Sequence, residues 1–264
     1  LGVAQVGRED SFFELGGHSL LALRLMERIR QIGHAAPVRT LFEHPTLAAF
    51  AHGLTETAPS SSIPLDGELQ LALDPAQMAC IERAVPGGGT NIADIYPLSP
   101  LQEGMLFHHR LQTQGDTYVT PLGLSFASLD QLERFVAHLN FLIERHDTLR
   151  TAVLWEGLPE PLQVVLHQAR LPLEWLELPE TVDAAEALAA HVHPTCFRLD
   201  VRVAPMLRAI AARDARNDRW LLQIPSHHMA LDNVSLGLIL EEITALAAGD
   251  ATGLLPSIPY RRHV

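Results

Sequence analysis

Apolar residues recur at helical spacing in two segments near the start of the chain. From Ser19 to Ile32 they stand three and four positions apart, and Gly33 follows as a helix stop. A second pattern runs from Thr40 to Gly53, but Pro45 breaks it into a turn and a new start. Both segments predict short amphipathic helices. Before Ser19 there is no room for another full helix, so we expect the first domain to lack its first helix or to be completed from outside this sequence.

A change of composition marks the end of this helical region. Residues 55–69 read TETAPSSSIPLDGEL, and such a run of proline, serine and small polar residues is typical of a linker. A short helical pattern at Pro75–Ala84 and the turn-rich stretch PGGGTN follow. The sequence therefore predicts a first domain at residues 1–54, a linker with a lead-in helix at 55–89, and a second domain at 90–264.

Helical and strand patterns alternate through the second domain, which is typical of an α/β fold. Helices are predicted from Ser99 or Pro100 onward and at Leu129–Glu144, Ala184–Val192 and Val234–Leu246. Strands are predicted at Tyr118–Phe126, Thr151–Trp155, Gln163–Leu166, Leu173–Leu176, Met206–Ala212 and Trp220–Ile224.

Composition narrows the class of protein. With 264 residues, of which 47% are hydrophobic, the chain is long enough for one large or two smaller globular cores. A formal net charge of -12 argues against nucleic acid or an anionic membrane as a partner. The two cysteines, Cys80 and Cys196, suggest neither a disulfide framework nor a CxxC site, which indicates the cytoplasm. The sequence has no signal-peptide pattern and no run long enough to span a membrane.

The stretch SHHMALDNVS at residues 226–235 offers the strongest candidate chemistry, because it follows the predicted strand WLLQI and precedes a helix. Histidine titrates near neutral pH, so His228 is a candidate general base. His227 points to the opposite face and is structural or shapes a channel. Asp232 either caps the following helix or holds a cation or a histidine in place. A metal ion is the poorer alternative, since adjacent histidines point to opposite faces and no third ligand is evident.

A second histidine pair precedes an acid in HHRLQTQGD at residues 108–116. One interpretation is a second functional cluster of His108, His109 and Asp116. The other is a plain helix end, in which the two histidines complement the helix dipole and Gly115 terminates the turn. The pattern leaves both open.

Two further stretches contain polar residues with alternative roles. In RHDTLRT at residues 145–151, Arg145 or Arg150 is a candidate partner for Asp232, because a buried carboxylate is costly unless it is paired. In FFELGGHSL at residues 12–20, Ser19 stands at the mouth of an apolar helix. It either caps that helix or carries a large group, since the neighbouring glycines leave space and a helix N-terminus favours a phosphate.

Together these stretches resemble a piece of a nonribosomal peptide synthetase. DSFFELGGHSLLA at residues 10–22 is similar to the peptidyl carrier motif, whose serine is Ser19 here. SPLQEGMLF at 99–107, RHDTLRTAV at 145–153 and SHHMALDNVS at 226–235 resemble the motifs of condensation domains in their usual order. HHRLQTQGD is similar to an extra motif of the dual epimerization/condensation branch, which adds His108, His109 and Asp116 to the catalytic candidates.

The resemblance implies a fold, a cofactor and partners. The first domain is expected to be a small all-α carrier bundle without its first helix, carrying covalent 4'-phosphopantetheine on Ser19. The second is expected to be the N-terminal one of two α/β, chloramphenicol-acetyltransferase-like lobes around a tunnel, with a mixed sheet. The implied partners are a phosphopantetheinyl transferase, an upstream adenylation domain, a downstream carrier domain and an aminoacyl or peptidyl thioester. With half of the tunnel wall absent, we expect the isolated chain to lack full condensation activity.

The resemblance also implies a reaction. His228 would remove and return the Cα proton of the thioester and then orient or deprotonate the acceptor amine, and the start of the helix at Val234 is a candidate donor toward developing negative charge. Asn233 stands where condensation motifs usually have glycine, which favours the dual branch over an ordinary condensation domain. The alternatives are condensation without epimerization, a non-catalytic platform that docks carriers, and a free-standing acyltransferase that uses coenzyme A thioesters.

Overall fold

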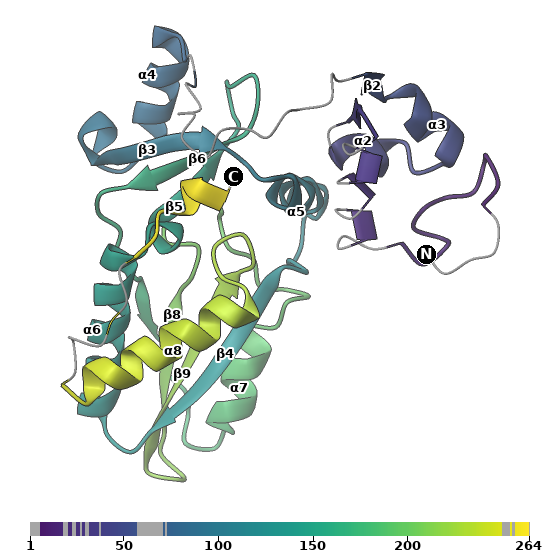
Figure 1. Ribbon diagram of the computed structural model, residues 1–264. Helices are drawn as coiled ribbons and strands as arrows, with labels where there is room; N and C mark the ends of the chain where they lie inside the picture. Colours follow the sequence, from purple (N-terminus) through teal and green to yellow (C-terminus); the bar gives the residue numbers. More distant parts are fainter. Residues whose placement is uncertain are drawn as a thin grey trace. The chain divides into compact units, whose positions relative to one another are not determined.

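The computed structural model of the chain describes residues 6–17, 21–22, 25–26, 28–29, 32–36, 38–56, 71, 73–249, 254 and 257–263. The chain forms two compact units, whose helices and strands Figure 1 labels. The first unit comprises Leu1–Gln70 with Leu98–Leu111, and the second comprises Leu71–Pro97 with Gln112–Val264. In the described parts of both units, no helix combines the length and the apolar character that crossing a membrane would require.

The first unit contains short helices around a small apolar core. Helices α2 (Val38–Glu43) and α3 (Leu47–His52) are separated at Pro45, and Thr46 caps α3 by accepting a hydrogen bond from the amide of Ala49. The described residues of the predicted first helix, at 21–22, 25–26 and 28–29, are helical. Strands β1 (His34–Ala35) and β2 (Thr55–Glu56) pair antiparallel. The core consists of Ala22, Ile29, Leu41 and Phe50.

Helix α5 (Pro100–Leu111) also belongs to the first unit. Ser99 starts it with a reciprocal cap, because the Ser99 amide donates to Oε1 of Gln102 and the Gln102 amide donates back to Oγ of Ser99. An aromatic stack runs from Phe13 over Phe42 to Phe107, with ring centroids 5.1 and 5.5 Å apart. Ring stacking therefore contributes to the packing of this unit.

A four-stranded mixed sheet forms the centre of the second unit. Its strand order is β4 (Val119–Phe126), β9 (Arg219–His227), β8 (Ala209–Asp214) and β7 (Leu173–Trp175), and only β7 and β8 pair in parallel. Side chains alternate along β8, so that Ala209 and Ala211 face one core cluster while Ile210 and Ala212 face the other. Helices α6 (Leu129–Arg145) and α8 (Asn233–Ala247) cover the first face, and α7 (Ala184–His191) covers the second (Figure 1).

A second, antiparallel sheet has the order β3 (Ile92–Pro97), β6 (Leu162–Leu166) and β5 (Thr151–Leu154). Helix α4 (Pro75–Ala84) packs on it through the fully buried Ile81. Short 3-10 helices flank these elements, at Gly88–Asn91, Asp147–Arg150 and Tyr260–His263.

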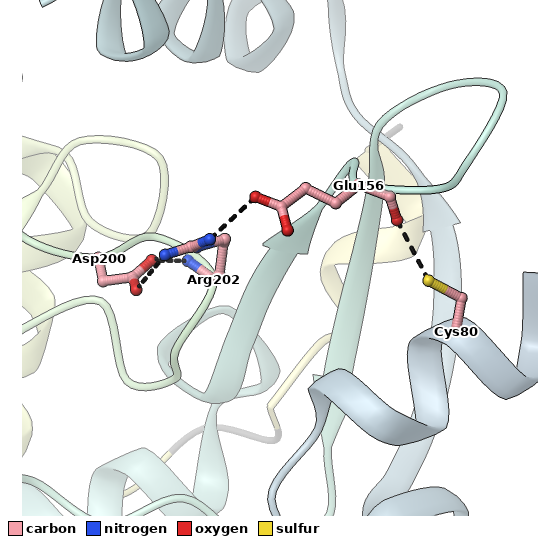
Figure 2. A network of polar contacts seen from close by, with 4 residues as sticks. All are labelled: Cys80, Glu156, Asp200 and Arg202. Atoms are coloured by element: carbon pink, nitrogen blue, oxygen red, sulfur yellow. Dashed lines mark hydrogen bonds and ion pairs between the residues drawn. The ribbon is translucent and has the colours of Figure 1, made fainter.

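A polar network connects α4 with the turn after β5. The Cys80 thiol donates to the carbonyl oxygen of Glu156 at 3.2 Å, and the Glu156 carboxylate bonds Arg202, which also binds Asp200 (Figure 2). A cavity of about 290 Å³ is lined by the four residues of this network and by Trp155, among others. The residues that line it do not include the histidines of SHHMALDNVS, so this cavity is separate from the predicted site.

The predicted elements match the structure with small shifts at their ends. Strand β8 begins at Ala209 rather than Met206, because Leu207 pairs with Ser226 only as an isolated bridge. Strand β9 extends to His227. Strand β3 was not predicted, since a register shift between Ile92 and Asp94 breaks the alternation of its side chains. The predicted linker falls largely at residues 57–70, which lie outside the described residues.

Candidate active site

The two histidines of SHHMALDNVS lie where strand β9 ends, four and five residues before the N-cap of helix α8. His227 is the last residue of the strand and is 0% exposed, whereas His228 is half-buried. The different burial follows from the strand geometry that sends neighbouring side chains to opposite faces. His228 is therefore the histidine of the pair that the turn presents toward solvent.

His228 is held at both its backbone and its ring. Its amide donates to the carbonyl oxygen of Tyr118 at 2.9 Å, and its Nε2 lies 2.9 Å from the hydroxyl of Thr120. Thr120 is on β4, opposite Ser226 of β9 in the antiparallel register. Thr120 of β4 thus fixes the imidazole, and Tyr118, just before β4, fixes the backbone of His228. Thr120 was not a sequence-predicted site residue, since only the pairing of β4 with β9 brings it near His228.

Asp232 caps helix α8. Its Oδ1 accepts a hydrogen bond from the amide of Ser235 at 2.7 Å, and this bond holds the pKa of the Asp232 carboxyl below its ordinary value of 3.8. The charge of His228 acts in the same direction. The capping alternative for Asp232 is thereby confirmed. The carboxylate thus occupies the amide of Ser235 at the start of this helix.

Asp116 and His227 meet in the interior of the second unit. Oδ2 of Asp116 lies 3.3 Å from Nε2 of His227, and the two side chains are both fully buried. Oδ1 of Asp116 accepts a hydrogen bond from the amide of Tyr118 at 2.9 Å. The structure thus brings together one acid and one histidine from two motifs that are far apart in the sequence.

His108 and His109 lie in the last turn of α5, as the helix-end interpretation predicts. The ring of His108 meets Phe42 edge-on at a centroid distance of 4.8 Å, within the first unit. Burial lowers the pKa of His108, which favours the neutral imidazole. His109 is buried. These contacts give His108 a packing role.

The structure gives Arg145 and Arg150 other partners than the predicted Asp232. Nε of Arg145 lies 3.7 Å from a carboxylate oxygen of Glu242 on α8, and His146 contacts the same carboxylate at 2.6 Å. Arg150 donates to the carbonyl oxygen of Leu166. Both arginines therefore hold elements of the lobe together, which agrees with structural support. Asn233 is the exposed first residue of α8.

Ser19 lies outside the described residues. The loop before it is described as far as Gly17, and Gly16 has a φ of 86° that favours glycine. A side chain at position 17 would collide with Phe12, because an added Cβ would lie 2.4 Å from the ring and from the carbonyl oxygen of that residue. The Gly-Gly pair is thus required by the turn itself.

Comparison with known protein families identifies a family for each of the two domains. The family described as "Condensation domain" matches residues 92–264. The chain belongs to the condensation domain family. The family described as "Phosphopantetheine attachment site" matches residues 1–54, so a carrier-type domain that takes 4'-phosphopantetheine precedes the condensation domain. This order of domains is that of a nonribosomal peptide synthetase.

Among relatives, the malpibaldin synthetase of Mortierella alpina is 38% identical over 277 residues, which cover 100% of this chain and 5% of that protein. Surfactin synthase subunit 2 of Bacillus subtilis (strain 168) is 30% identical over 251 residues, covering 95% of this chain and 6% of that protein. The chain thus spans about one twentieth of the length of these relatives.

A solved structure supports the fold of the condensation domain. The first condensation domain of the calcium-dependent antibiotic synthetase, in complex with a substrate analogue, superposes with a TM-score of 0.50 at 18% identity, and the match covers 62% of this chain and 41% of that one. The predicted fold class, a small helical carrier followed by a chloramphenicol-acetyltransferase-like α/β lobe with a mixed sheet, is confirmed.

Proposed function

We propose that this chain takes part in nonribosomal peptide synthesis, as a carrier followed by the N-terminal lobe of a condensation domain of the dual epimerization/condensation type. Ser19 carries the phosphopantetheine arm, which supplies the thioester linkage for an aminoacyl or peptidyl group. The lobe receives this thioester for inversion of its Cα centre and for peptide bond formation. The adenylation domain that loads the arm, the next carrier and the remaining half of the condensation domain are proposed partners.

The observation that carries the proposal is the presentation of His228. This imidazole is half-buried at a strand-to-helix turn, and Thr120 and Tyr118 fix its ring and its backbone. An imidazole fixed in this way is suited to accept a proton from an amine and to return it to a leaving group. The buried His227 shapes the turn and does not meet substrate.

The proposal that this chain epimerizes its substrate rests on the resemblance of HHRLQTQGD, at residues 108–116, to the extra motif of the dual branch. Proton removal from Cα and its return on the other face need a base and a site that excludes bulk water. His228 serves as the base in both the epimerization and the transfer step.

The chirality of the product tests the proposal. A protein that contains this chain together with the rest of the condensation domain and the next carrier is loaded with an L-aminoacyl arm, and the dipeptide is hydrolysed and analysed on a chiral phase. We expect the donor residue in the D configuration. An L configuration throughout supports the second candidate, an ordinary condensation domain.

Replacement of the base separates catalysis from docking. We expect His228→Ala to reduce peptide transfer by a factor of about 100 or more, since general base catalysis contributes roughly 10²–10⁴ in rate. His167→Ala serves as the control, because His167 is exposed on the same unit. Unchanged transfer in His228→Ala contradicts the catalytic role and favours a platform that only docks carriers.

A further inference from the structure

The loop that contains Asp116 is clamped to the segment after helix α7. Gly115 has a φ of 65°, and a Cβ at this position would lie 2.4 Å from the carbonyl oxygen of Pro194 and 2.5 Å from Thr195. The Asp116 amide donates to the same Pro194 oxygen at 2.8 Å, and Arg198 donates to the carbonyl oxygen of Gly115 at 3.3 Å. Only glycine permits this approach, so the Gly-Asp pair of HHRLQTQGD places the aspartate at one defined point.

At that point the carboxylate of Asp116 accepts one backbone hydrogen bond and lies close to one ring nitrogen of His227. Its Oδ1 accepts from the Tyr118 amide at 2.9 Å, and its Oδ2 lies 3.3 Å from Nε2 of His227. The side chain of Asp116 is fully buried. Burying a carboxylate without polar partners costs free energy, so the contacts of both Asp116 oxygens stabilise the carboxylate in this position.

The ring of His227 is oriented from its other nitrogen as well. The Met229 amide donates to Nδ1 of His227 at 3.1 Å, so Nδ1 is an acceptor and the hydrogen of the neutral ring is on Nε2, the nitrogen nearest Asp116. The amide of Ala230 donates to the carbonyl oxygen of His227 at 2.9 Å. His227, the last residue of β9, thus accepts hydrogen bonds from the following turn at both its ring and its carbonyl oxygen.

Two short routes connect Asp116 with His228. One passes through the ring of His227 to the next peptide unit. The other passes through Tyr118, whose amide binds Asp116 and whose carbonyl oxygen binds the amide of His228. Both routes consist of contacts inside the second unit.

We propose that Asp116 is a positioning residue of this site. It holds His227 in the Nε2–H tautomer and, through His227 and Tyr118, sets the place of the His228 imidazole. The expectation that a change at Asp116 slows peptide transfer rests on the proposed function. The expectation that it displaces the rings of His227 and His228 does not.

The isosteric change Asp116→Asn tests the proposal. Asparagine has one acceptor oxygen where aspartate has two, so its NH₂ group must face either the Tyr118 amide or Nε2–H of His227. The control is Asp130→Asn, which removes a carboxylate that is 74% exposed on α6 and pairs with Arg134 in the same helix. Both changes remove one negative charge.

The first measurement is made on the 264-residue chain, by NMR of its histidine ring nitrogens. We expect the native chain to show His227 as the Nε2–H tautomer. Asp116→Asn is expected to shift the ring resonances of both His227 and His228, and Asp130→Asn to leave them unchanged. Unchanged resonances of His228 in Asp116→Asn overturn the proposal.

The second measurement is peptide transfer in a protein that also contains the rest of the condensation domain. We expect Asp116→Asn to lower kcat by about 10- to 100-fold, because a small misplacement of a catalytic group has effects of that size, with KM for the acceptor carrier changed less than about twofold. A kcat equal to that of Asp130→Asn overturns the proposal. If His228→Ala retains full transfer, the proposed function is wrong. The NMR resonances of the His227 and His228 rings in Asp116→Asn then decide by themselves whether Asp116 positions these rings.

A folding defect is distinguished by a second variant. Asp116→Ser is smaller, and its hydroxyl oxygen takes the place of only one of the two acceptors, so we expect the same direction of change. If both variants unfold while Asp130→Asn remains folded, Asp116 is structural and the positioning role is overturned.

Discussion

A single carboxylate determines how helix α8 begins. Asp232 accepts the Ser235 amide, and the pKa of this carboxyl is lowered mainly by that hydrogen bond. Asp232→Ala is expected to reduce the free energy of unfolding by about 1 kcal/mol at neutral pH, the usual effect of losing a capping side chain. The exposed position of Asp232 keeps the ionic part of this effect small. Urea unfolding of the 264-residue chain measures it.

The pH dependence of that effect follows from the direction of the pKa shift. A carboxyl whose pKa is lowered by folding stabilises the fold above its ordinary value of 3.8, and this stabilisation is lost as the pH falls through the lowered pKa. The difference between the native chain and Asp232→Ala should therefore shrink in acid. Asp232→Asn keeps a good cap but has no charge to lose, so its stability relative to Asp232→Ala should not change with pH. A difference that grows in acid contradicts this role of Asp232.

At the scale of elements, the loop before β4 depends on the backbone of Gly115. Its left-handed φ and the short approach to Pro194 both exclude a side chain. We expect Gly115→Ala to reduce the free energy of unfolding by at least about 2 kcal/mol, because strain at a left-handed residue adds to a collision with a backbone oxygen. The matched control is Gly237→Ala in α8, where an added Cβ meets nothing within 4 Å.

The control should change stability in the opposite direction. Alanine in a helix interior is more favourable than glycine by up to about 1 kcal/mol, so Gly237→Ala is expected to stabilise the chain. Thermal unfolding of the two variants gives the comparison. Equal stability of Gly115→Ala and the native chain shows that the loop can move away from Pro194, which contradicts the clamp described above.

The long amphipathic elements could be predicted from the sequence, and the reason is physical. Helix α6 has its apolar residues on one face because that face meets the sheet, so its spacing alone reveals it. Strand β3 could not be predicted in the same way. A register shift disturbs its alternation, and its polar Asp94 finds a partner in the distant Arg261.

At the scale of the whole molecule, local patterns predicted where the candidate site residues lie but not which residues they contact. His228 at a strand-to-helix turn and Asp232 as a helix cap follow from local patterns. The contact between Asp116 and His227 depends on the pairing of β4 with β9, which sets Val119 opposite His227. The partner of Arg145, likewise, depends on how α6 packs on α8. Such choices are made by tertiary packing, so a local pattern does not contain them.

The proposed function depends first on the attachment of the phosphopantetheine arm to Ser19. We expect the chain, incubated with a phosphopantetheinyl transferase and coenzyme A, to gain the mass of one phosphopantetheinyl group, and Ser19→Ala to gain none. Ser11→Ala is the control, because Ser11 lies in the same domain and in the same family match. The carrier role requires that the arm is attached at Ser19 and not at another serine. The attachment point sets the length of the tether, and the length of the tether sets the local concentration of the substrate at the lobe. If Ser19→Ala is modified to the same extent as the native chain, the arm is attached to another serine. If the native chain is not modified, the result favours an acyltransferase that uses coenzyme A thioesters directly.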